Sequence, residues 1–273
     1  MIDYYKKYED KILEYKKQGH IVPTSDLVKN SEQIAKIKES CKINTAVLDH
    51  VAANIKAGMS TQQSVDLVSS FTKEHNAICA PYRFEGYPKS VCTSINDEVC
   101  HGIPNRRVHL HEGDIVNVDV STIYNGYYSD ASRMFEIGKV SDERHRLVEI
   151  TKECLRRGIE AAKPWGFVGD IGEAISSYAL SMGCSVVVEL GGHGVGLEFH
   201  EDPFISHVGK KNTGMLLVPG MIFTIEPMIN AGKARVVLDS YNGWTIYTAD
   251  GKDSAQVEHT ILITEDGNEI LTY

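Results

Sequence analysis

Features that would place the chain in a membrane, outside the cell or on nucleic acid are missing from the sequence. No apolar run approaches the roughly 18 residues that a membrane-spanning helix requires, and residues 1–17 are charged throughout, so no signal peptide is expected. None of the six cysteines forms a C-x-x-C pair, which favours free thiols over a disulfide framework or a zinc ribbon. The net charge of -9, with no dense stripe of Lys or Arg, argues against a nucleic-acid partner. We therefore expect a cytoplasmic protein that contacts no membrane.

The composition that remains is typical of a folded enzyme-sized protein. Hydrophobic residues make up 42% of the chain and charged residues 24%, with only 8 prolines. A length of 273 residues suits one large α/β domain. We assign residues 29–273 to that domain and treat residues 1–28 as an N-terminal extension of unknown role, with a short helix and a solvated position as the default expectation.

Helical periodicity appears twice in the same arrangement. Residues 31–57 carry apolar side chains at three- and four-residue spacings, and the capping box of Ser60 and Gln63 begins a second helix directly afterwards. The same plan recurs from Ser141, which opens one helix, to Gly183, which ends the next. The sequence therefore predicts two helix pairs.

The two helix pairs are each followed by β-branched strands. Residues 67–71 resemble residues 174–178, and strands are expected at residues 114–121 and 221–226. We interpret the chain as two α/β halves that share one sheet, with the helices on its outer face.

An acidic hairpin is the first feature that indicates chemistry. Asn125 and Gly126 form the strongest hairpin signal, and a turn at these residues pairs Asp130 with Ser121. Asp130 then lies diagonally from Asp119 on the same sheet face. Two adjacent carboxylates repel each other unless a cation neutralises them, so a divalent metal is the expected occupant. The alternative is that one acid is buried by chance and the other is exposed in the turn.

Two further segments place ionisable residues among glycines or apolar strand residues. Glycines flank His193, and His200 follows seven residues later. Glu226 and Glu258 each lie in a strand without a basic partner, because alternation directs His259 away from Glu258. Each histidine taken alone is more often an ordinary core or surface residue than a ligand.

Taken in order, these segments resemble the methionine aminopeptidase family. The motifs that carry the resemblance are His101-Gly-Ile-Pro104, Val118-Asp-Val120, Asp130, Gly192-His-Gly194, Phe199-His-Glu201, Thr224-Ile-Glu-Pro-Met228 and Glu258-His-Thr260. The similarity covers residues 31–273 and is closest to the type I enzymes, because no zinc-finger region precedes the core. It implies the pita-bread α/β fold, with pseudo-two-fold halves around a shared, mostly antiparallel sheet.

The resemblance also implies a dinuclear metal site. The ligands carried over are Asp119, Asp130, His193, Glu226 and Glu258, with Asp130 and Glu258 bridging two divalent ions. Such an oxygen-rich set suits manganese, iron or cobalt, and zinc is also accepted. In the implied reaction a metal-activated water attacks the peptide carbonyl and Glu226 shuttles a proton. His200 and His101 act on the substrate without ligating metal.

The same resemblance predicts a pocket for the methionine side chain. Its expected walls are Phe84, Tyr87, Cys92, Phe199 and Trp244, besides the substrate contacts of His101 and His200. The segment at residues 80–87 departs in length from the family pattern. Whether Tyr82 or Phe84 lines the pocket is therefore open, and Cys79 is not assigned to it.

Competing interpretations are a proline-directed aminopeptidase or creatinase-type hydrolase of the same fold, and a binding protein that has lost its metals. Only about 30 residues precede the core, whereas the proline-directed relatives generally carry a further domain there, and no ligand is missing. The expected substrate is the N-terminus of a peptide or nascent chain. We expect a monomer, and any ribosome contact would be transient, since the first 30 residues hold six lysines against five acids.

Overall fold

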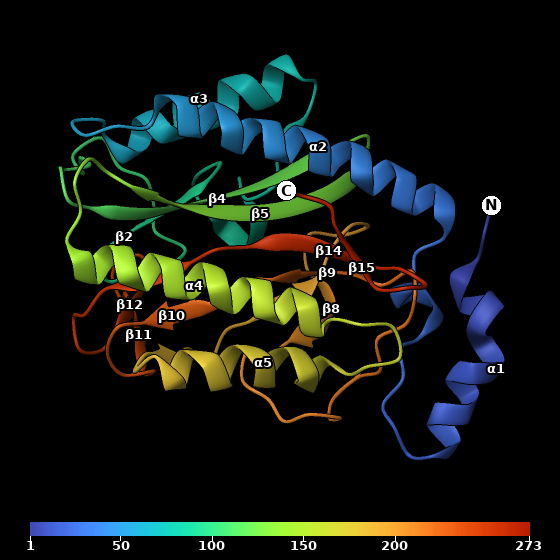
Figure 1. Ribbon diagram of the computed structural model, residues 1–273. Coiled ribbons are helices and arrows are strands. Elements are labelled where there is room, and N and C mark those ends of the chain that lie inside the picture. Colours follow the sequence, from blue (N-terminus) through green and yellow to red (C-terminus); the bar gives the residue numbers. More distant parts are fainter.

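The helices lie in pairs on the outer sides of antiparallel sheets, as the computed structural model of residues 1–273 shows (Figure 1). The first pair is α2 (Ser31–Asn54) and α3 (Thr61–Glu74), and the second pair is α4 (Asp142–Ala161) and α5 (Val168–Ser181). Strands fill the space between the pairs. The predicted α/β class and its two halves are confirmed.

Local capping interactions determine where the first pair of helices begins. The Asn30 side chain accepts hydrogen bonds from the backbone N–H groups of Glu32 and Gln33, both at 3.0 Å, and the Gln33 side chain accepts from the Asn30 N–H at 2.9 Å. At α3 the Gln63 side chain accepts from the Ser60 N–H at 2.8 Å. These bonds satisfy N–H groups that have no partner within the helix.

The first half builds a four-stranded antiparallel sheet around the β4–β5 hairpin. Its strands are β1 (Ile78–Cys79), β2 (Cys92–Ile95), β4 (Ile115–Tyr124) and β5 (Tyr127–Glu136). Asn125 and Gly126 have φ values of 50° and 82°, the paired positive angles of a type I′ turn. Ser121 pairs with Asp130, so the predicted register is confirmed.

The second half builds a five-stranded sheet in the order β15-β14-β9-β7-β8. Its strands are β7 (Gly192–Gly194), β8 (Glu201–Ile205), β9 (Ile222–Ile225), β14 (His259–Ile263) and β15 (Asn268–Ile270). Ser132 of β5 forms a bridge with Glu258, immediately before β14. The single shared sheet expected from the sequence is thus two sheets that meet at this β5–β14 seam.

Two three-stranded antiparallel sheets lie at the end of the molecule opposite α1 (Figure 1). One contains β6 (Ser185–Val186), β10 (Met228–Asn230) and β13 (Ser254–Gln256), and the other contains β3 (Glu98–Cys100), β11 (Val236–Leu238) and β12 (Ile246–Thr248). A short 3-10 helix, η2 (Phe84–Gly86), precedes β2.

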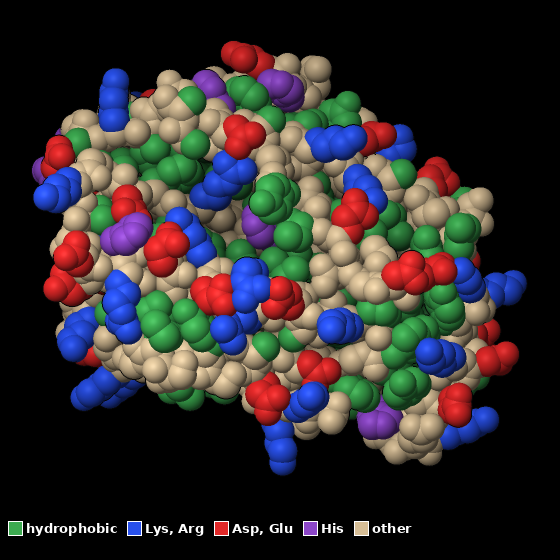
Figure 2. Space-filling model, in the orientation of Figure 1, with side chains coloured by type: hydrophobic (Ala, Val, Ile, Leu, Met, Phe, Trp, Pro, Cys, Tyr) green, Lys and Arg blue, Asp and Glu red, His purple; other side chains and the backbone are tan.

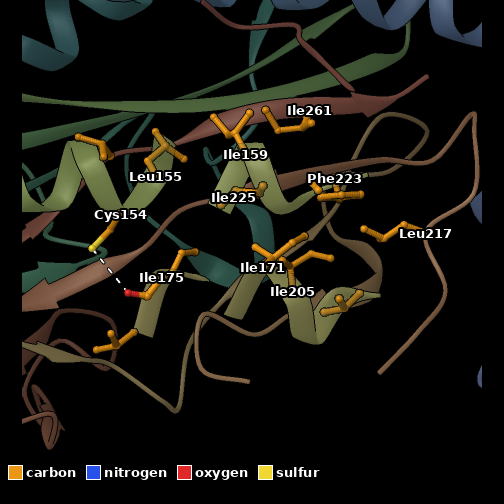
Figure 3. Close-up of a cluster of buried hydrophobic side chains, with 14 of the residues drawn as sticks. Cys154, Leu155, Ile159, Ile171, Ile175, Ile205, Leu217, Phe223, Ile225 and Ile261 are labelled. Carbon is orange, nitrogen blue, oxygen red and sulfur yellow. Dashed lines mark hydrogen bonds between the residues drawn. The ribbon is translucent and has the colours of Figure 1, made fainter. Parts of the chain in front are cut away.

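The main core lies between the α4–α5 pair and the second sheet. It contains 29 buried residues, and Figure 3 shows Leu155 of α4 and Ile175 of α5 in one cluster with the strand residues Phe223, Ile225 and Ile261. A separate cluster of 12 buried residues lies beneath α2 and α3. Each half therefore has its own core, and a smaller cluster of 6 buried residues joins α2 of the first half to the sheet of the second.

The N-terminal segment packs on the second half. It contains α1 (Tyr4–Lys17) and η1 (Ser25–Leu27), and Ile12 of α1 is fully buried in the main core. The ring of Tyr8 lies edge-on to Trp165 with 5.3 Å between ring centroids. Residues 1–28 are therefore not a solvated appendage, although their assignment as a separate extension stays a prediction.

The surface over α4 and α5 carries charges of both signs, interspersed in Figure 2 without a continuous basic stripe. None of the helices combines the length and the apolar character needed to cross a bilayer.

Candidate active site

Asp119 and Asp130 reach the same side of the β4–β5 hairpin. Residues 119 and 121 share a face of β4, and the Ser121 hydroxyl donates to Asp130 Oδ1 at 2.8 Å. Asp119 Oδ1 is buried with no hydrogen-bond partner. A buried carboxylate oxygen without a donor is unfavourable unless a cation accompanies it.

The β5–β14 seam brings Glu258 beside Asp130. The Thr260 hydroxyl donates to the backbone carbonyl of Asp130 at 2.7 Å, which fastens β14 to β5. His259 points to the opposite side, where its ring stacks on Tyr273 at 6.0 Å. The alternation predicted for this strand is therefore confirmed, and it directs His259 away from Glu258.

Glu226, at the end of β9, is held by neutral donors. The Thr224 hydroxyl donates to its Oε1 at 2.8 Å, and the Gln256 side-chain amide donates to its Oε2 at 3.0 Å. The backbone N–H of Glu226 donates to Nε2 of the buried His207 at 3.1 Å. These bonds orient the carboxylate without cancelling its charge, so it stays available to a cation.

His193 directs one ring nitrogen at the carboxylates. Its Nδ1 lies 2.9 Å from the Gly194 carbonyl oxygen, which makes Nδ1–H the donor. Its Nε2 lies 3.7 Å from oxygens of both Asp130 and Glu226. The unprotonated Nε2 lone pair therefore faces the acid cluster, as in a metal-ligating histidine.

The glycines beside His193 are required by close backbone contacts. A Cβ atom at Gly192 would lie 2.2 Å from the carbonyl oxygen of Thr224, and one at Gly194 would lie 2.2 Å from that of Asp202. Only glycine lets β7 approach β8 and β9 so closely. The strand that presents His193 is thus fixed between its two neighbours.

Electrostatics make the cluster unfavourable for protein groups alone. Burial raises the pKa of Asp119 to about 7 and that of Glu226 to about 8. Burial, with repulsion from the neighbouring carboxylates, raises the pKa values of Asp130 and Glu258 well above their usual range. Burial lowers the pKa of His193 to about 3, so its contacts with the acids are not ion pairs at neutral pH. A cation supplied from outside the chain would relieve the repulsion between these carboxylates.

The donor atoms are close enough to hold metal. Within this cluster, three groups have donor atoms within 4.8 Å of one another: Asp119, Asp130 and Glu258; His193, Glu226 and Glu258; and Asp130, His193 and His200. The first two groups meet at Glu258 and together contain all five predicted ligands. The unpartnered Asp119 oxygen and this oxygen-rich set both fit divalent metal.

His200 and His101 lie at the edge of the cluster. The ring of His200 is 4.2 Å from that of His193 and stacks on Phe199 at 4.3 Å, while the ring of His101 is 6.3 Å from that of Trp244. His101 has a φ of 56°, a conformation that non-glycine residues rarely adopt outside turns and functional sites. Burial lowers the pKa of His101 to about 4 and lowers that of His200 as well, so both rings are neutral at pH 7 and can donate an N–H.

A cavity of about 320 Å³ opens beside the cluster. Its walls include all the side chains expected to surround methionine: Phe84, Tyr87, Cys92, Phe199 and Trp244. Between Tyr82 and Phe84, the structure places Phe84 in the cavity, 4.8 Å from the ring of Phe199, and leaves Tyr82 52% exposed elsewhere. Cys79 lies in β1 and does not line the cavity.

A sequence comparison identifies the family behind this geometry. The profile of metallopeptidase family M24 matches residues 35–265, which include every candidate ligand. The chain belongs to metallopeptidase family M24. As an M24 metallopeptidase it is a divalent-metal enzyme, in agreement with the acid and histidine groups described above.

Within the M24 family the chain groups with the methionine aminopeptidases. It is 51% identical over 240 residues to methionine aminopeptidase A of Synechocystis sp., covering 88% of this chain and 94% of that protein. The crystal structure of methionine aminopeptidase from Rickettsia prowazekii superposes with a TM-score of 0.89 at 44% identity, covering 90% of this chain and 99% of that one. The prolidase of Pyrococcus horikoshii shares only the fold, with a TM-score of 0.70 and 23% identity, and this chain covers 63% of it.

Several residues of this M24 site were missed by the sequence interpretation. Cys100, Leu190 and Met228 also line the cavity, and Ser121 and Gln256 orient carboxylates. Ser121 could have been found from its pairing with Asp130 in the predicted hairpin. Gln256 could have been found from alternation with Glu258, whereas no local signal marks the other three.

Proposed function

We propose that the chain removes an unblocked N-terminal methionine from peptides and newly made proteins whose second residue is small. The main support for this proposal is that one cavity combines two kinds of wall. Carboxylate and imidazole side chains suited to metal form one side, and aromatic and sulfur-bearing side chains form the other. Such walls suit an unbranched thioether. The proline-directed activity of the more distant fold relatives is the alternative.

The metal centre is proposed to hold two divalent ions. Glu258 belongs to both donor groups, and Asp130 of the first group lies 3.7 Å from His193 of the second, so these two carboxylates would be placed to serve both ions. Asp119, His193 and Glu226 complete the set. When bound, such ions acidify a water molecule and polarise the scissile carbonyl. Manganese, iron, cobalt and zinc are all compatible with four carboxylates and one imidazole.

The chain's own side chains then supply proton transfer and charge stabilisation. Glu226, whose two oxygens are fixed by Thr224 and Gln256, is placed to carry a proton to the departing amine. His200, neutral at pH 7, donates its N–H to the carbonyl oxygen as negative charge develops there. His101 donates to the substrate amide near the leaving nitrogen.

The shape of the cavity explains why only the first residue is released. Its volume of about 320 Å³ beside the cluster is small, which favours a single side chain over a longer N-terminal segment. The second residue must pass close to the metals, so a bulky side chain there disturbs the attack geometry. Discrimination therefore appears mainly in kcat/KM.

The setting that we propose is a cytoplasmic monomer that meets its substrates as nascent chains, with at most a transient ribosome contact. The net charge of -9, and the charges of both signs interspersed on the face shown in Figure 2, argue against stable binding to nucleic acid.

The test compares three peptides with enzyme loaded with Mn(II) or Co(II). Methionine should be released from Met-Ala-Ser and far more slowly from Met-Leu-Ser, and alanine should not be released from Ala-Pro-Ser. Release of alanine without methionine would favour the proline-directed alternative. No release from any peptide by metal-loaded protein would favour a binding protein.

A further inference from the structure

A buried lysine lies outside the catalytic cluster. The side chain of Lys29 is 1% exposed, and its ammonium forms an ion pair with Glu201, whose side chain is 10% exposed. Charged groups are almost never buried so completely unless they have a partner. None of the predicted ligand or pocket roles uses either residue.

The carboxylate of Glu201 also fastens the loop that precedes it. Its Oε1 accepts hydrogen bonds from the backbone N–H groups of Leu197 at 2.7 Å and Glu198 at 3.0 Å, while its Oε2 faces Lys29. Phe199 and His200 lie between these anchor points. One carboxylate thus closes a short loop that carries both a pocket wall and a proposed catalytic group.

The same residue is coupled to the strand of the metal ligand. Glu201 pairs with Gly194 across β7 and β8, and a Cβ atom at Gly194 would lie 3.0 Å from that of Glu201. A shift of Glu201 would therefore displace the backbone both at His200 and at Gly194, the residue after His193.

Lys29 is itself fixed by the frame of the second half. Its backbone N–H donates to the Gly220 carbonyl at 2.9 Å, and Val28 forms a bridge with Met221 immediately before β9. The N-terminal segment, packed through Ile12, leads directly into this position. The ammonium is thus held on a rigid support that does not belong to the loop.

We propose that Lys29 is a positioning residue of the active site, which acts through Glu201 to hold residues 197–200 so that His200 and Phe199 face the cavity. The proposal rests on the proposed function for its kinetic readout but not for its structural one. Without the ammonium, the buried carboxylate is uncompensated and draws in water, and the loop that it closes shifts.

The variants are chosen to separate charge from bulk. Lys29→Met keeps an unbranched chain of similar length and removes only the ammonium. Glu201→Gln keeps the shape of the side chain, but its amide cannot pair with both the loop and Lys29. If the amide oxygen accepts from the N–H groups of the loop, the NH2 group faces the Lys29 ammonium. In the reverse orientation the NH2 group faces the N–H groups of the loop. In Lys29→Met/Glu201→Gln the first orientation becomes acceptable.

We expect Lys29→Met and Glu201→Gln each to lower kcat by about 10- to 100-fold, as a misplacement of about 1 Å does, at unchanged metal content. The double variant should recover part of this loss in kcat. In a His200→Ala background, Lys29→Met should lower kcat little further, because Lys29 acts on catalysis through the position of His200. Lys7→Met is the matched control, since it removes an exposed ion pair with Glu265 and should leave kcat unchanged.

Hydrogen exchange supplies the readout that is independent of activity. In Lys29→Met the amides of Leu197 and Glu198 should exchange faster, while amides of β9 keep their protection. If the exchange of both amides and the kcat of Lys29→Met match those of the parent, Lys29 serves stability alone and the proposal is wrong. The proposal is equally wrong if the effects of Lys29→Met and His200→Ala on kcat are additive. If Lys29→Met does not fold, Glu201→Gln and the double variant decide between the same outcomes. A parent enzyme that releases no methionine would refute the proposed function, and loop exchange would still test the positioning role.

Discussion

Replacing Gly192 by alanine should disable the metal site through a backbone contact. The added Cβ atom would lie 2.2 Å from the Thr224 carbonyl oxygen, whereas ordinary van der Waals contact begins at 3.4 Å. β7 must therefore move away from β9 by about 1 Å, because a carbonyl within a sheet cannot rotate aside. His193 follows Gly192 directly, and its Nε2 is already 3.7 Å from Glu226.

A displacement of this size should lower kcat/KM by about 100-fold, which corresponds to about 2.7 kcal/mol of transition-state stabilisation. Overpacking should also cost about 1 to 3 kcal/mol of folding free energy. Metal affinity measured by calorimetry with Mn(II) should fall along with kcat/KM, because a ligand has moved.

Gly267→Ala provides the matched control for this change. Gly267 has no atom within 4 Å of its would-be Cβ and no positive φ, so the same substitution should leave affinity and kcat/KM as in the parent. If Gly192→Ala binds metal and turns over like the parent, the claim that close strand contacts fix His193 is refuted.

Three further outcomes are expected. His200→Ala should lower kcat by about 100- to 1,000-fold at unchanged metal content, and loss of metal with activity would make His200 a ligand instead. Phe84→Ala should raise KM for methionyl peptides about tenfold, whereas Tyr82→Ala should not; the reverse result would contradict the cavity assignment. The free energy of unfolding of the metal-free, chelator-treated protein should rise as the pH falls from about 8.5 to 7. The pKa values of Asp119 and Glu226 are raised to about 7 and about 8, so in this range the folded chain binds protons that the unfolded chain does not. Each such proton contributes about 1.4 kcal/mol per pH unit, and below about pH 6.5 the buried neutral histidines oppose the gain. Chemical denaturation at the two pH values measures this, and a loss of stability at pH 7 would contradict it.

The hairpin shows how far the sequence alone can predict this site. Asn125 and Gly126 specify a type I′ turn through local backbone preferences, and this turn determines which residues of the two strands face each other. The pairing of Ser121 with Asp130 could therefore be predicted, as could the alternation that separates Glu258 from His259. The starts of α3 and α4 followed from Ser60 and Ser141 for the same reason, whereas α2 ends at Asn54 and not at the predicted residue 57.

Interactions between distant segments could not be predicted in this way. The bridge from Ser132 to Glu258 is the point where the two sheets meet, and no local pattern encodes it. The pair of Lys29 and Glu201 joins segments 172 positions apart, and both residues look like ordinary surface charges in the sequence. Burial of Ile12 likewise depends on the assembled second half, which is why the N-terminal segment was expected to be solvated.

The most direct test of the account is a metal titration of chelator-treated enzyme, followed by free methionine released from Met-Ala-Ser. The metal-free chain should release none, and activity should rise with added Mn(II) to a plateau reached with no more than two ions per chain. Asp130→Ala, which lacks a bridging ligand, should stay folded and inactive throughout the titration. Full activity in the metal-stripped parent, or no methionine release at any metal concentration, would contradict the central claim.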